Sequence, residues 1–583
     1  MKRASDFPLY DVTPFSSIRE MLSLAAEEAA SKNAFRFSVG SNVEDITYRH
    51  FVDDVYALGA ALHELGLTDR HVAQIGENSY RYITVYLTMI ASCGVYMPID
   101  KDLPEEDILH LLRHSDSSAV FYTEKYSELM HRNADALDGI RYFILVEPYG
   151  SEAAAEDSDP RFLSYTRLLA HGYDLVSSGY TGYAELTPDP AAMRMLVYTS
   201  GTTGIAKGVM LSEHNLVSSV YYGLQVSGVY DSCLSVLPYH HTYEAVSGIL
   251  VGIHHHATIC INENLKTVMK NFALFQPEYI YLVPAFVEEF YRRIWATAKK
   301  SGKDKALHAL IKTSNAMRKT GIDMRKTFFS SIREAFGGKL IKIVCGGAPI
   351  RPELGEFFDA IGITLVNGYG ITECSPLVSA NRDNFNDPAT VGVVLPCCQV
   401  RFDGVTEDGD GEICVKGDIV MMGYYKDPER TAEVLEPDGW FHTGDYGRMN
   451  EAEQLIITGR KKNIIVLSNG KNIYPEELEG YIQGIPYVKE VIVYGAKNDL
   501  GNETSLNAEV FLNDEKLEEL HITDPAEVLK HDVAKVCAKL PAYKRISKII
   551  IRSHEFAKTT SKKIKRTGIG ESSDDAAESE QNS

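Results

Sequence analysis

The sequence lacks the features that mark secreted, membrane-spanning or metal-clustering proteins. Its nine cysteines are an odd number and are scattered, and no Cys-x-x-Cys pair indicates a zinc or dithiol site. No apolar stretch follows the basic residues at the start, as a signal peptide requires, and no later run is as long and apolar as a transmembrane helix. We therefore expect reduced thiols and a cytoplasmic location.

Positive charge is also scarce. The 583 residues include 59 Lys and Arg against 80 Asp and Glu, which gives a formal net charge of −21. Such a chain is poorly suited to binding nucleic acid without a local basic stripe, so we expect no nucleic-acid partner. The last residues, ESSDDAAESEQNS, contain five acids and no large apolar side chain. We expect residues 567–583 to form a disordered acidic tail.

The remaining composition is that of a large folded protein. Hydrophobic residues make up 44% and charged residues 24%, close to globular averages, and the length predicts more than one core. A helix predicted after Ser79 precedes the apolar run 95–99, and further strands are predicted at 119–123 and 143–147. Residues 264–336 are predicted to be largely helical. The alternation predicts an α/β fold with a mainly parallel sheet.

The pattern changes towards the C-terminus. From about residue 391, short segments broken by glycine indicate a small β-rich subdomain. A lysine-rich break, GRKKN, follows residue 458, and mixed helix and strand patterns continue to residue 566. We therefore predict a large N-terminal domain of parallel α/β layers over residues 1–458, with the β-rich subdomain at about 391–458, and a hinged α+β domain over residues 459–566.

The most informative segment is YTSGTTGIAKGVML at residues 198–211, where hydroxyl-bearing residues and glycines alternate. Backbone N–H groups in such a loop approach phosphate oxygens closely, and Lys207 adds a positive charge. The Walker pattern G-x-x-x-x-G-K-[ST] is not met, because Ala206 and Gly208 stand at two of its required positions. We predict a nucleotide-phosphate loop of another kind. Its candidate contacts are Thr199, Ser200, Gly201, Thr202, Thr203, Gly204 and Lys207.

This loop resembles the signature of the AMP-forming adenylating enzymes, the superfamily of acyl-CoA synthetases, peptide-synthetase adenylation domains and beetle luciferases. Other segments stand in that family's order, so the resemblance extends from about residue 47 to residue 566. They are LPYHHTYE (237–244), GGAP (346–349), NGYGITE (367–373), WFHTGDYG (440–447), the hinge stretch 457–479 and FAKTTSKKIKR (556–566).

The resemblance implies a role for each motif of the predicted large domain. His241 stands near the carboxylate substrate. Tyr369 stacks on the adenine, Thr372 contacts phosphate, and Glu373 holds Mg²⁺ through an oxygen, the ligand that a hard cation requires. The glycine-rich backbone beside the adenine permits close approach because it lacks bulk. The other predicted nucleotide contacts are Gly346, Gly347, Ala348, Asn367, Gly368 and Gly370.

The resemblance also implies a hinge between the predicted domains. Asp445 is suited to accept both ribose hydroxyls, and Arg460 is the second ribose or phosphate contact. Many family members have Asp where Gly459 stands here, yet glycine keeps the conformational freedom that rotation needs. The predicted hinge residues are Gly459, Lys461 and Lys462.

Two further groups of residues are assigned to the C-terminal domain by the resemblance. Lys563 aligns with the catalytic lysine of the family, and Lys562 is the alternative because several lysines are adjacent. The predicted contacts with coenzyme A are Ser468, Asn469 and Gly470.

The resemblance implies two half-reactions. A carboxylate attacks the α-phosphate of MgATP to give an acyl adenylate and pyrophosphate, and the thiol of coenzyme A then displaces AMP. The first step brings two anions together and needs cations at the developing charge. The second needs the lysine removed, so the small domain is expected to rotate. LPxxHxxE and the block VPAFVEEFYRRIW look most like medium- and long-chain fatty acyl-CoA synthetases, with ATP, Mg²⁺ and coenzyme A as cofactors.

Several alternatives stay open at this point. Ala245 stands where some fatty-acid members have a gating tryptophan, so the chain length is undecided. The apolar helix after His241 either lines an acyl tunnel or is a core helix. The acceptor is coenzyme A or an acyl carrier protein, and the acid is fatty or aromatic. A fatty substrate implies transient membrane contact of a peripheral kind, and the sequence does not disclose the oligomeric state.

Overall fold

The computed structural model describes most of the chain. The described residues are 2–199, 206–467, 472–497, 503–538, 540–558, 564–566 and 569. Apart from residue 569, the predicted acidic tail lies outside this set. Among the helices of the described part, none is both long and apolar enough to cross a bilayer.

Contacts divide the chain into two compact units. The first comprises Met1–Val400, Val415–His442 and Met449–Leu455, and the second comprises Arg401–Cys414, Thr443–Arg448 and Ile456–Ser583. The boundary predicted between residues 458 and 459 falls inside the second unit. Parts of the predicted β-rich subdomain therefore group with the C-terminal residues.

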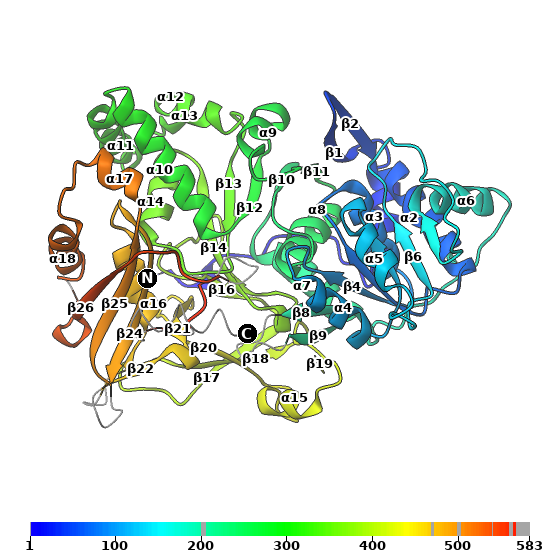
Figure 1. Ribbon diagram of the computed structural model, residues 1–583. Helices are drawn as coiled ribbons and strands as arrows, with labels where there is room; N and C mark the ends of the chain where they lie inside the picture. The colour runs from blue at the N-terminus through cyan, green and yellow to red at the C-terminus, as the bar shows by residue number, and fades with distance from the viewer. Residues whose placement is uncertain are drawn as a thin grey trace. The chain divides into compact units, whose positions relative to one another are not determined.

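An eight-stranded sheet organises one part of the first unit (Figure 1). It is parallel except at one edge, where two strands add antiparallel pairs. Three predicted strands and the helix capped by Ser79 are confirmed here: Ser79 Oγ accepts a hydrogen bond from the backbone N–H of Tyr82. The strand order is β19 (Gly423–Tyr424), β9 (Lys207–Ser212), β8 (Met193–Thr199), β4 (Val95–Ile99), β3 (His71–Ile75), β5 (Ser117–Tyr122), β6 (Tyr142–Leu145) and β7 (Phe162–Ser164).

Helices cover this sheet because their apolar stripes face its buried strands. Ile108, Leu111 and Leu112 of one helix and Leu129 and Met130 of another join the strands in one buried cluster. The helices of this part of the chain are α2 (Tyr48–Glu64), α3 (Tyr80–Ile90), α4 (Glu105–His114), α5 (Ser127–Asn133), α6 (Tyr165–Ser177) and α7 (Glu213–Val226).

A nine-stranded sheet forms the other large layer of the first unit (Figure 1). Its central strands are parallel, so their carboxyl ends meet at one edge. The order is β16 (Val393–Val394), β15 (Leu377–Ala380), β14 (Thr364–Gly370), β13 (Lys342–Cys345), β12 (Tyr279–Leu282), β10 (Ser232–Ser235), β11 (Thr258–Ile261), β1 (Asn33–Val39) and β2 (Asn42–Thr47).

The helices of this second layer include one π-helix. They are α1 (Ile18–Glu28), the π-helix η3 (Tyr243–Leu250), α8 (Val251–His254), α9 (Val268–Phe275), α10 (Pro284–Lys300), α11 (Asp304–Arg318), α12 (Arg325–Phe328), α13 (Ser330–Ala335), α14 (Pro352–Ala360) and the 3-10 turn η4 (Thr372–Cys374).

Residues 264–336 are largely helical, as predicted, but strand β12 interrupts the helices. All four of its residues are buried. A short apolar run of this kind shows no alternation that separates it from a buried helix. The boundary signals lie outside the run: Gln276 ends α9 in the left-handed conformation with φ of 50°, and Pro284 begins α10.

The predicted β-rich stretch supplies strands to three sheets. Its segments VGVVLP and MMGYY contribute β16 and β19 to the two large sheets. The other strands form a four-stranded sheet, and a short helix, α15 (Pro428–Val434), lies between two of them in the sequence. The order of that sheet is β17 (Cys398–Asp403), β18 (Gly411–Gly417), β20 (Phe441–Met449) and β21 (Leu455–Arg460).

The C-terminal residues form an α+β arrangement with its own apolar core, as predicted for a small domain. In its three-stranded sheet, the central strand pairs with one neighbour in antiparallel and with the other in parallel orientation. The elements are β22 (Ile465–Val466), β23 (Asn472–Ile473), α16 (Pro475–Gln483), β24 (Val488–Lys497), β25 (Glu503–Leu512), α17 (Asp514–Glu519), α18 (Pro525–Val536) and β26 (Ile546–Arg552).

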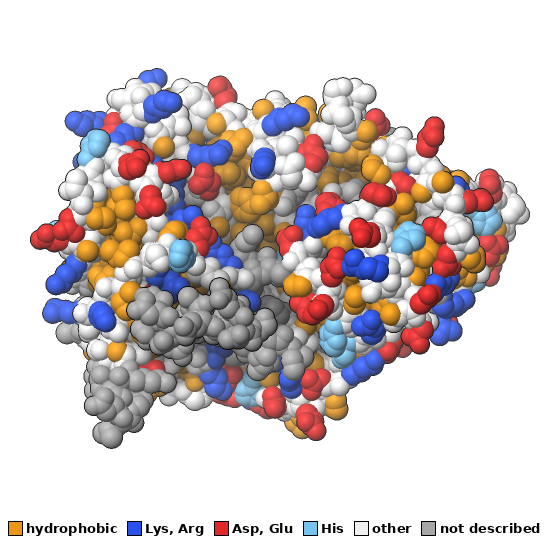
Figure 2. Space-filling view, viewed as in Figure 1, with side chains coloured by type: hydrophobic (Ala, Val, Ile, Leu, Met, Phe, Trp, Pro, Cys, Tyr) orange, Lys and Arg blue, Asp and Glu red, His pale blue; other side chains and the backbone are white. Residues whose placement is uncertain are grey.

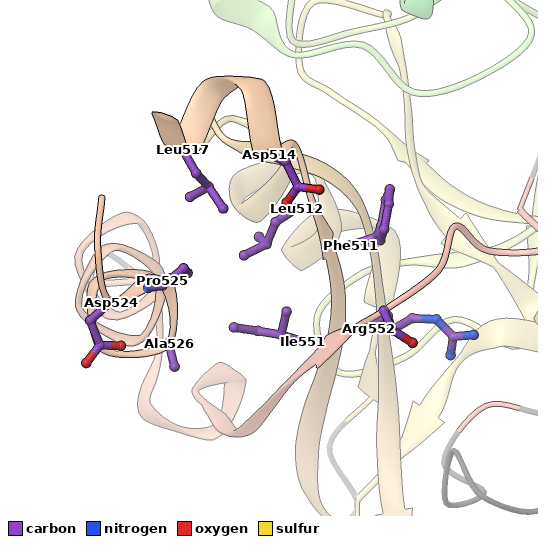
Figure 3. A pocket seen from close by; sticks show the side chains of 10 residues that line it. Phe511, Leu512, Asp514, Leu517, Asp524, Pro525, Ala526, Ile551 and Arg552 are labelled. Carbon is purple, nitrogen blue, oxygen red and sulfur yellow. The ribbon is translucent and has the colours of Figure 1, made fainter. Parts of the chain in front are cut away.

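A shallow groove opens in this C-terminal arrangement. It has a volume of about 310 Å³ and lies among β25, β26, α17 and the start of α18 (Figure 3). Leu512, Leu517 and Ile551 point into it from different elements (Figure 3). None of the residues that line the groove is predicted to act in catalysis.

Candidate active site

The hairpin of β8 and β9 carries the predicted phosphate loop. Thr199, the last residue of β8, is the register partner of Lys207, the first residue of β9. The chain therefore leaves and re-enters the sheet at a single pair of positions. The five predicted contacts between them lie outside the described residues: Ser200, Gly201, Thr202, Thr203 and Gly204.

Lys207 is connected to Glu373 through a tyrosine that sequence reasoning missed. The Nζ atom of Lys207 lies 4.7 Å from the centroid of the Tyr424 ring. The Tyr424 hydroxyl donates a hydrogen bond to Glu373 Oε1 at 2.9 Å. Burial, and then the Glu373 carboxylate, raise the pKa of that hydroxyl, which stays a donor. MMGYY predicted only a strand, and no signal in the sequence distinguished this tyrosine.

Strand β19 fixes this connection. Tyr424 pairs with Val209 of β9 in an antiparallel register. On the other side, the backbone N–H of Met421 donates to the carbonyl oxygen of Glu373 at 2.9 Å. Backbone hydrogen bonds therefore hold the phosphate hairpin and the NGYGITE motif to the same short segment, residues 421–424.

Glu373 fits a divalent cation. Its side chain is buried, and the Tyr424 hydrogen bond engages only Oε1. Thr372 precedes it in the turn η4, so a hydroxyl and a carboxylate leave the chain at adjacent positions. Mg²⁺ is commonly held by one or two carboxylates together with substrate phosphates, and this donor set suits that arrangement.

The GGAP turn and the NGYG segment lie side by side at the carboxyl edge of the nine-stranded sheet. Cys345 of β13 is the register partner of Asn367 of β14, so Gly346 is next to Gly368. A Cβ atom on Gly346 would lie 3.3 Å from the Gly368 carbonyl oxygen and 3.4 Å from the Tyr243 ring. Ligands of open α/β sheets bind at such carboxyl ends. A side chain at position 346 would therefore be tightly packed against both neighbours.

The other residues of these two motifs differ in exposure. Gly347, with φ of 83°, and Ala348 are exposed. Asn367 and Tyr369 are buried, and a Cβ atom on Gly370 would lie 2.4 Å from the Pro376 carbonyl oxygen. The adenine contacts assigned to these positions stay predictions.

His241 stands two residues before the π-helix η3. The backbone N–H groups of Glu244 and Ala245 both donate to the His241 carbonyl oxygen, and the ring lies 4.1 Å from that of His240. π-helices are rare and are frequent at functional sites. The helix is buried from Glu244 to Leu250, which leaves both predicted readings open, a tunnel wall and a core helix.

Glu244 is a buried carboxylic acid within this π-helix. Burial raises the pKa of its side chain to about 8, although Ser235 Oγ donates a hydrogen bond to Oε1. Oε2 has no hydrogen-bond partner among the described residues. A Cβ atom on Gly248 would lie 2.8 Å from the carboxyl carbon, so glycine makes room for the acid. At neutral pH we expect Glu244 to be protonated.

Replacing Glu244 by Gln tests this protonation state. The folded protein holds the proton up to about pH 8, whereas the unfolded chain releases it near the ordinary pKa of 4.5. Rising pH between these values therefore destabilises the wild type, by at most about 1.4 kcal/mol per pH unit. Urea unfolding at about pH 5.5 and 7.5 should show a smaller loss of stability for Glu244→Gln. Equal losses in both proteins would contradict the assignment.

In the second unit, the structure brings together the two residues predicted to bind ribose. Arg460 Nε lies 2.7 Å from Asp445 Oδ1. Asp445 is on β20 and its side chain is only 4% exposed, whereas that of Arg460, at the end of β21, is 44% exposed. The ion pair fixes the carboxylate and leaves part of the guanidinium open to a ligand.

Gly459 serves packing in this structure. A Cβ atom there would lie 2.8 Å from the Tyr474 ring and 3.0 Å from Glu476 Oε2. Its φ is not in the left-handed region. Glycine at this position is therefore explained by lack of space, and the hinge role stays a prediction.

The two other predicted hinge residues have opposite environments. Lys461 Nζ lies 2.6 Å from Glu412 Oε2, and this hydrogen bond raises the pKa of the lysine. Burial, and then the charges of Arg460 and Arg566, lower the pKa of Lys462.

The remaining predicted residues of this unit lie outside the described ones. These are Lys562, Lys563, Ser468, Asn469 and Gly470. The ends of the lysine segment are described: Lys558 and Ile564 form an antiparallel bridge, and the N–H of Lys565 donates to the Ala557 carbonyl oxygen at 2.8 Å.

Comparison with known proteins identifies the class that these elements define. Residues 22–425 match the family of AMP-binding enzymes, and residues 462–575 match the C-terminal domain of AMP-binding enzymes. The first match spans more than half of the chain. The protein therefore belongs to the AMP-binding enzyme family, as the motifs predicted.

Individual relatives agree with this. The human long-chain-fatty-acid–CoA ligase 6 is 28% identical over 475 residues, 77% of this chain and 67% of the relative. The peroxisomal long chain acyl-CoA synthetase 7 of Arabidopsis thaliana is 30% identical over 440 residues, 70% of this chain and 61% of the relative.

A solved structure confirms the predicted fold class. The adenylation domain of a carboxylate reductase from Mycobacterium chelonae has a TM-score of 0.76 at 20% identity, over 98% of this chain and 92% of that one. At this level of identity the likeness concerns the fold.

Proposed function

We propose that this protein is an AMP-forming ligase that activates a medium- to long-chain fatty acid as an acyl adenylate and transfers the acyl group to coenzyme A. The predicted enzyme class, an acid–thiol ligase that uses ATP and coenzyme A, is confirmed by the family match and the names of its relatives. The chain length, the use of Mg²⁺ and the residue roles are the finer parts of the proposal.

The observation that carries the proposal is the connection from Lys207 through Tyr424 to Glu373. Lys207 and Glu373 come from two motifs that are far apart in the sequence, and residues 421–424 make backbone hydrogen bonds to both motifs. An ammonium group and a carboxylate held in fixed positions suit the phosphates of ATP and their divalent cation.

In the first half-reaction, a carboxylate oxygen of the acid forms a bond to the α-phosphorus while the bond to pyrophosphate breaks. Lys207 would balance the charge that develops on the phosphate oxygens. Glu373, with Thr372 beside it, would hold Mg²⁺, which supplies further charge neutralisation when bound. Asp445, fixed by Arg460, would accept the ribose hydroxyls.

In the second half-reaction, the thiol of coenzyme A adds to the acyl carbonyl carbon. The bond between that carbon and the phosphate oxygen then breaks, and AMP leaves with the oxygen that the carboxylate contributed. We assign Lys563 to the first step alone, as the family resemblance implies.

The fatty nature of the acid rests on two arguments. The relatives named above are long-chain ligases, and the π-helix after His241 is buried from Glu244 to Leu250 and mostly apolar. Ala245 offers no bulky side chain that would block a long acyl chain at this position.

The test is to measure pyrophosphate and AMP release with carboxylic acids from acetate to long-chain and aromatic acids, each with and without coenzyme A. The proposal predicts turnover that depends on coenzyme A and is highest with a medium- or long-chain fatty acid. Pyrophosphate release that stops after one equivalent, whether or not coenzyme A is present, would contradict it and indicate an enzyme that loads a carrier protein.

A further inference from the structure

The helical segment from residue 292 to residue 339 is strongly basic in an acidic protein. It contains thirteen Lys and Arg against three Asp and Glu, a net charge of +10, whereas the whole chain carries −21. The rest of the chain therefore sums to −31. A basic region of this size attracts an anionic partner.

Three of the five arginines of this region are paired with carboxylates, whereas most of its exposed lysines are not. Arg293 pairs with Glu289 at 2.9 Å. Arg318 and Arg325 both pair with Asp359, at 2.6 and 3.0 Å. The positive charge of this region that has no carboxylate partner is therefore carried mainly by lysines. Seven exposed lysines form no ion pair with any described residue: Lys300, Lys303, Lys305, Lys312, Lys319, Lys326 and Lys339.

Three of these lysines lie on one side of α11 and its C-cap residue. Lys305, Lys312 and Lys319 are seven residues apart, which is close to two helical turns, so they point in nearly the same direction. Leu307 and Ser314 lie on the opposite side of the helix and are buried. The lysine stripe is therefore the outward side of a helix whose inner side is packed.

The same region also exposes apolar side chains. Leu310 and Ile322 are 36% and 49% exposed, and Leu265 and Leu274, beside and within α9, are 61% and 44% exposed. Helix α9 contacts α13 and so continues the same region. Blue and orange side chains are interspersed along the upper edge of Figure 2, where Figure 1 labels α9 and α11–α13.

We propose that this region, the basic face of α9–α13, binds a lipid bilayer that carries anionic headgroups. Lysines beside exposed apolar side chains are the combination that interfacial membrane binding uses, since the charges bind headgroups while the apolar groups reach the acyl boundary. An acidic protein such as an acyl carrier protein is the alternative occupant. The bilayer is favoured because the charged and apolar groups are spread over several helices, as a broad planar partner requires.

Membrane binding in this sense needs neither ATP nor coenzyme A. Only its use, the capture of fatty acids from the bilayer, rests on the proposed function. A protein without ligase activity that still binds vesicles would leave this inference standing and overturn the proposed function alone.

The experiment is co-sedimentation of the full-length protein with vesicles of phosphatidylcholine, with and without phosphatidylserine. The test variant is K305E/K312E/K319E, which reverses the lysine stripe. The matched control is K530E/K535E/K548E, which makes the same charge change at exposed lysines of the second unit. Circular dichroism spectra and thermal unfolding midpoints like those of the wild type verify that both variants are folded.

Wild type and control should bind the phosphatidylserine vesicles, and binding should weaken as salt is raised. The stripe variant should bind roughly 100-fold more weakly, since each lysine near the surface contributes about fivefold. Equal binding of the stripe variant and the control would overturn the proposal. Failure of the wild-type protein to bind the phosphatidylserine vesicles would overturn it as well. In the latter case, stripe-dependent binding of an acidic carrier protein would identify the alternative occupant.

Discussion

Replacing Lys563 by Ala is expected to lower acyl-adenylate formation by roughly 10²–10³-fold, because removal of one group that stabilises developing charge commonly has an effect of this size. Thioester formation from a supplied acyl adenylate should stay within about threefold of wild type, since that step no longer forms a bond to phosphorus. The two half-reactions are measured separately, as pyrophosphate release and as acyl-CoA formation from synthetic adenylate.

Lys562→Ala is the matched control for this experiment. It removes the same charge one position earlier and should lower neither step more than a few-fold. If the two variants exchange their behaviour, Lys562 is the catalytic residue. If Lys563→Ala slows both half-reactions equally, the assignment of the lysine to the first step is wrong.

Replacing Glu373 by Gln should lower pyrophosphate release by about 10²-fold and raise the Mg²⁺ concentration needed for half-maximal rate. Gln can still accept the hydrogen bond from Tyr424, so the contact seen in the structure is retained while the negative charge is lost. A hard divalent cation binds a neutral amide oxygen less tightly than a carboxylate. The rate is measured as a function of Mg²⁺ concentration at saturating ATP.

Tyr424→Phe separates the metal role from a structural one. It removes the hydrogen bond to Glu373 and keeps the carboxylate, so the Mg²⁺ dependence should change little and the rate should fall less than tenfold. A Glu373→Gln variant with the wild-type Mg²⁺ dependence would contradict the proposal that this carboxylate holds the cation.

Much of the fold could be predicted from the sequence, because the helix caps and apolar runs that indicate local structure agree with how these elements pack. Ser79 caps a helix whose stop precedes the fully buried strand β4, and the same alternation continues through β5 and β6. Strand β12 was not predicted, because its four residues are all buried and so show no alternation of apolar and polar side chains. The sequence did not predict that β16 and β19 join the two large sheets, because local sequence does not specify which strands pair.

The candidate site shows the same division. Sequence motifs found Lys207 and Glu373 separately, because each stands in a recognisable segment. Tyr424, which joins them, stands in a plain apolar run and is placed by the pairing of β19 with β9. Gly459 was interpreted through its conformational freedom, whereas the structure shows that the Tyr474 ring leaves no room for a side chain. Contacts between distant segments are the part that a single sequence does not disclose.

The central claim is that the acid becomes an acyl adenylate before it reaches coenzyme A. The most direct measurement is the fate of ¹⁸O from a fatty acid labelled in its carboxylate, followed in the products by mass spectrometry. Because the carboxylate oxygen attacks the α-phosphorus and stays there when the thiol displaces AMP, the account predicts one ¹⁸O atom in each AMP formed. AMP without label, or label found in orthophosphate together with ADP, would contradict it.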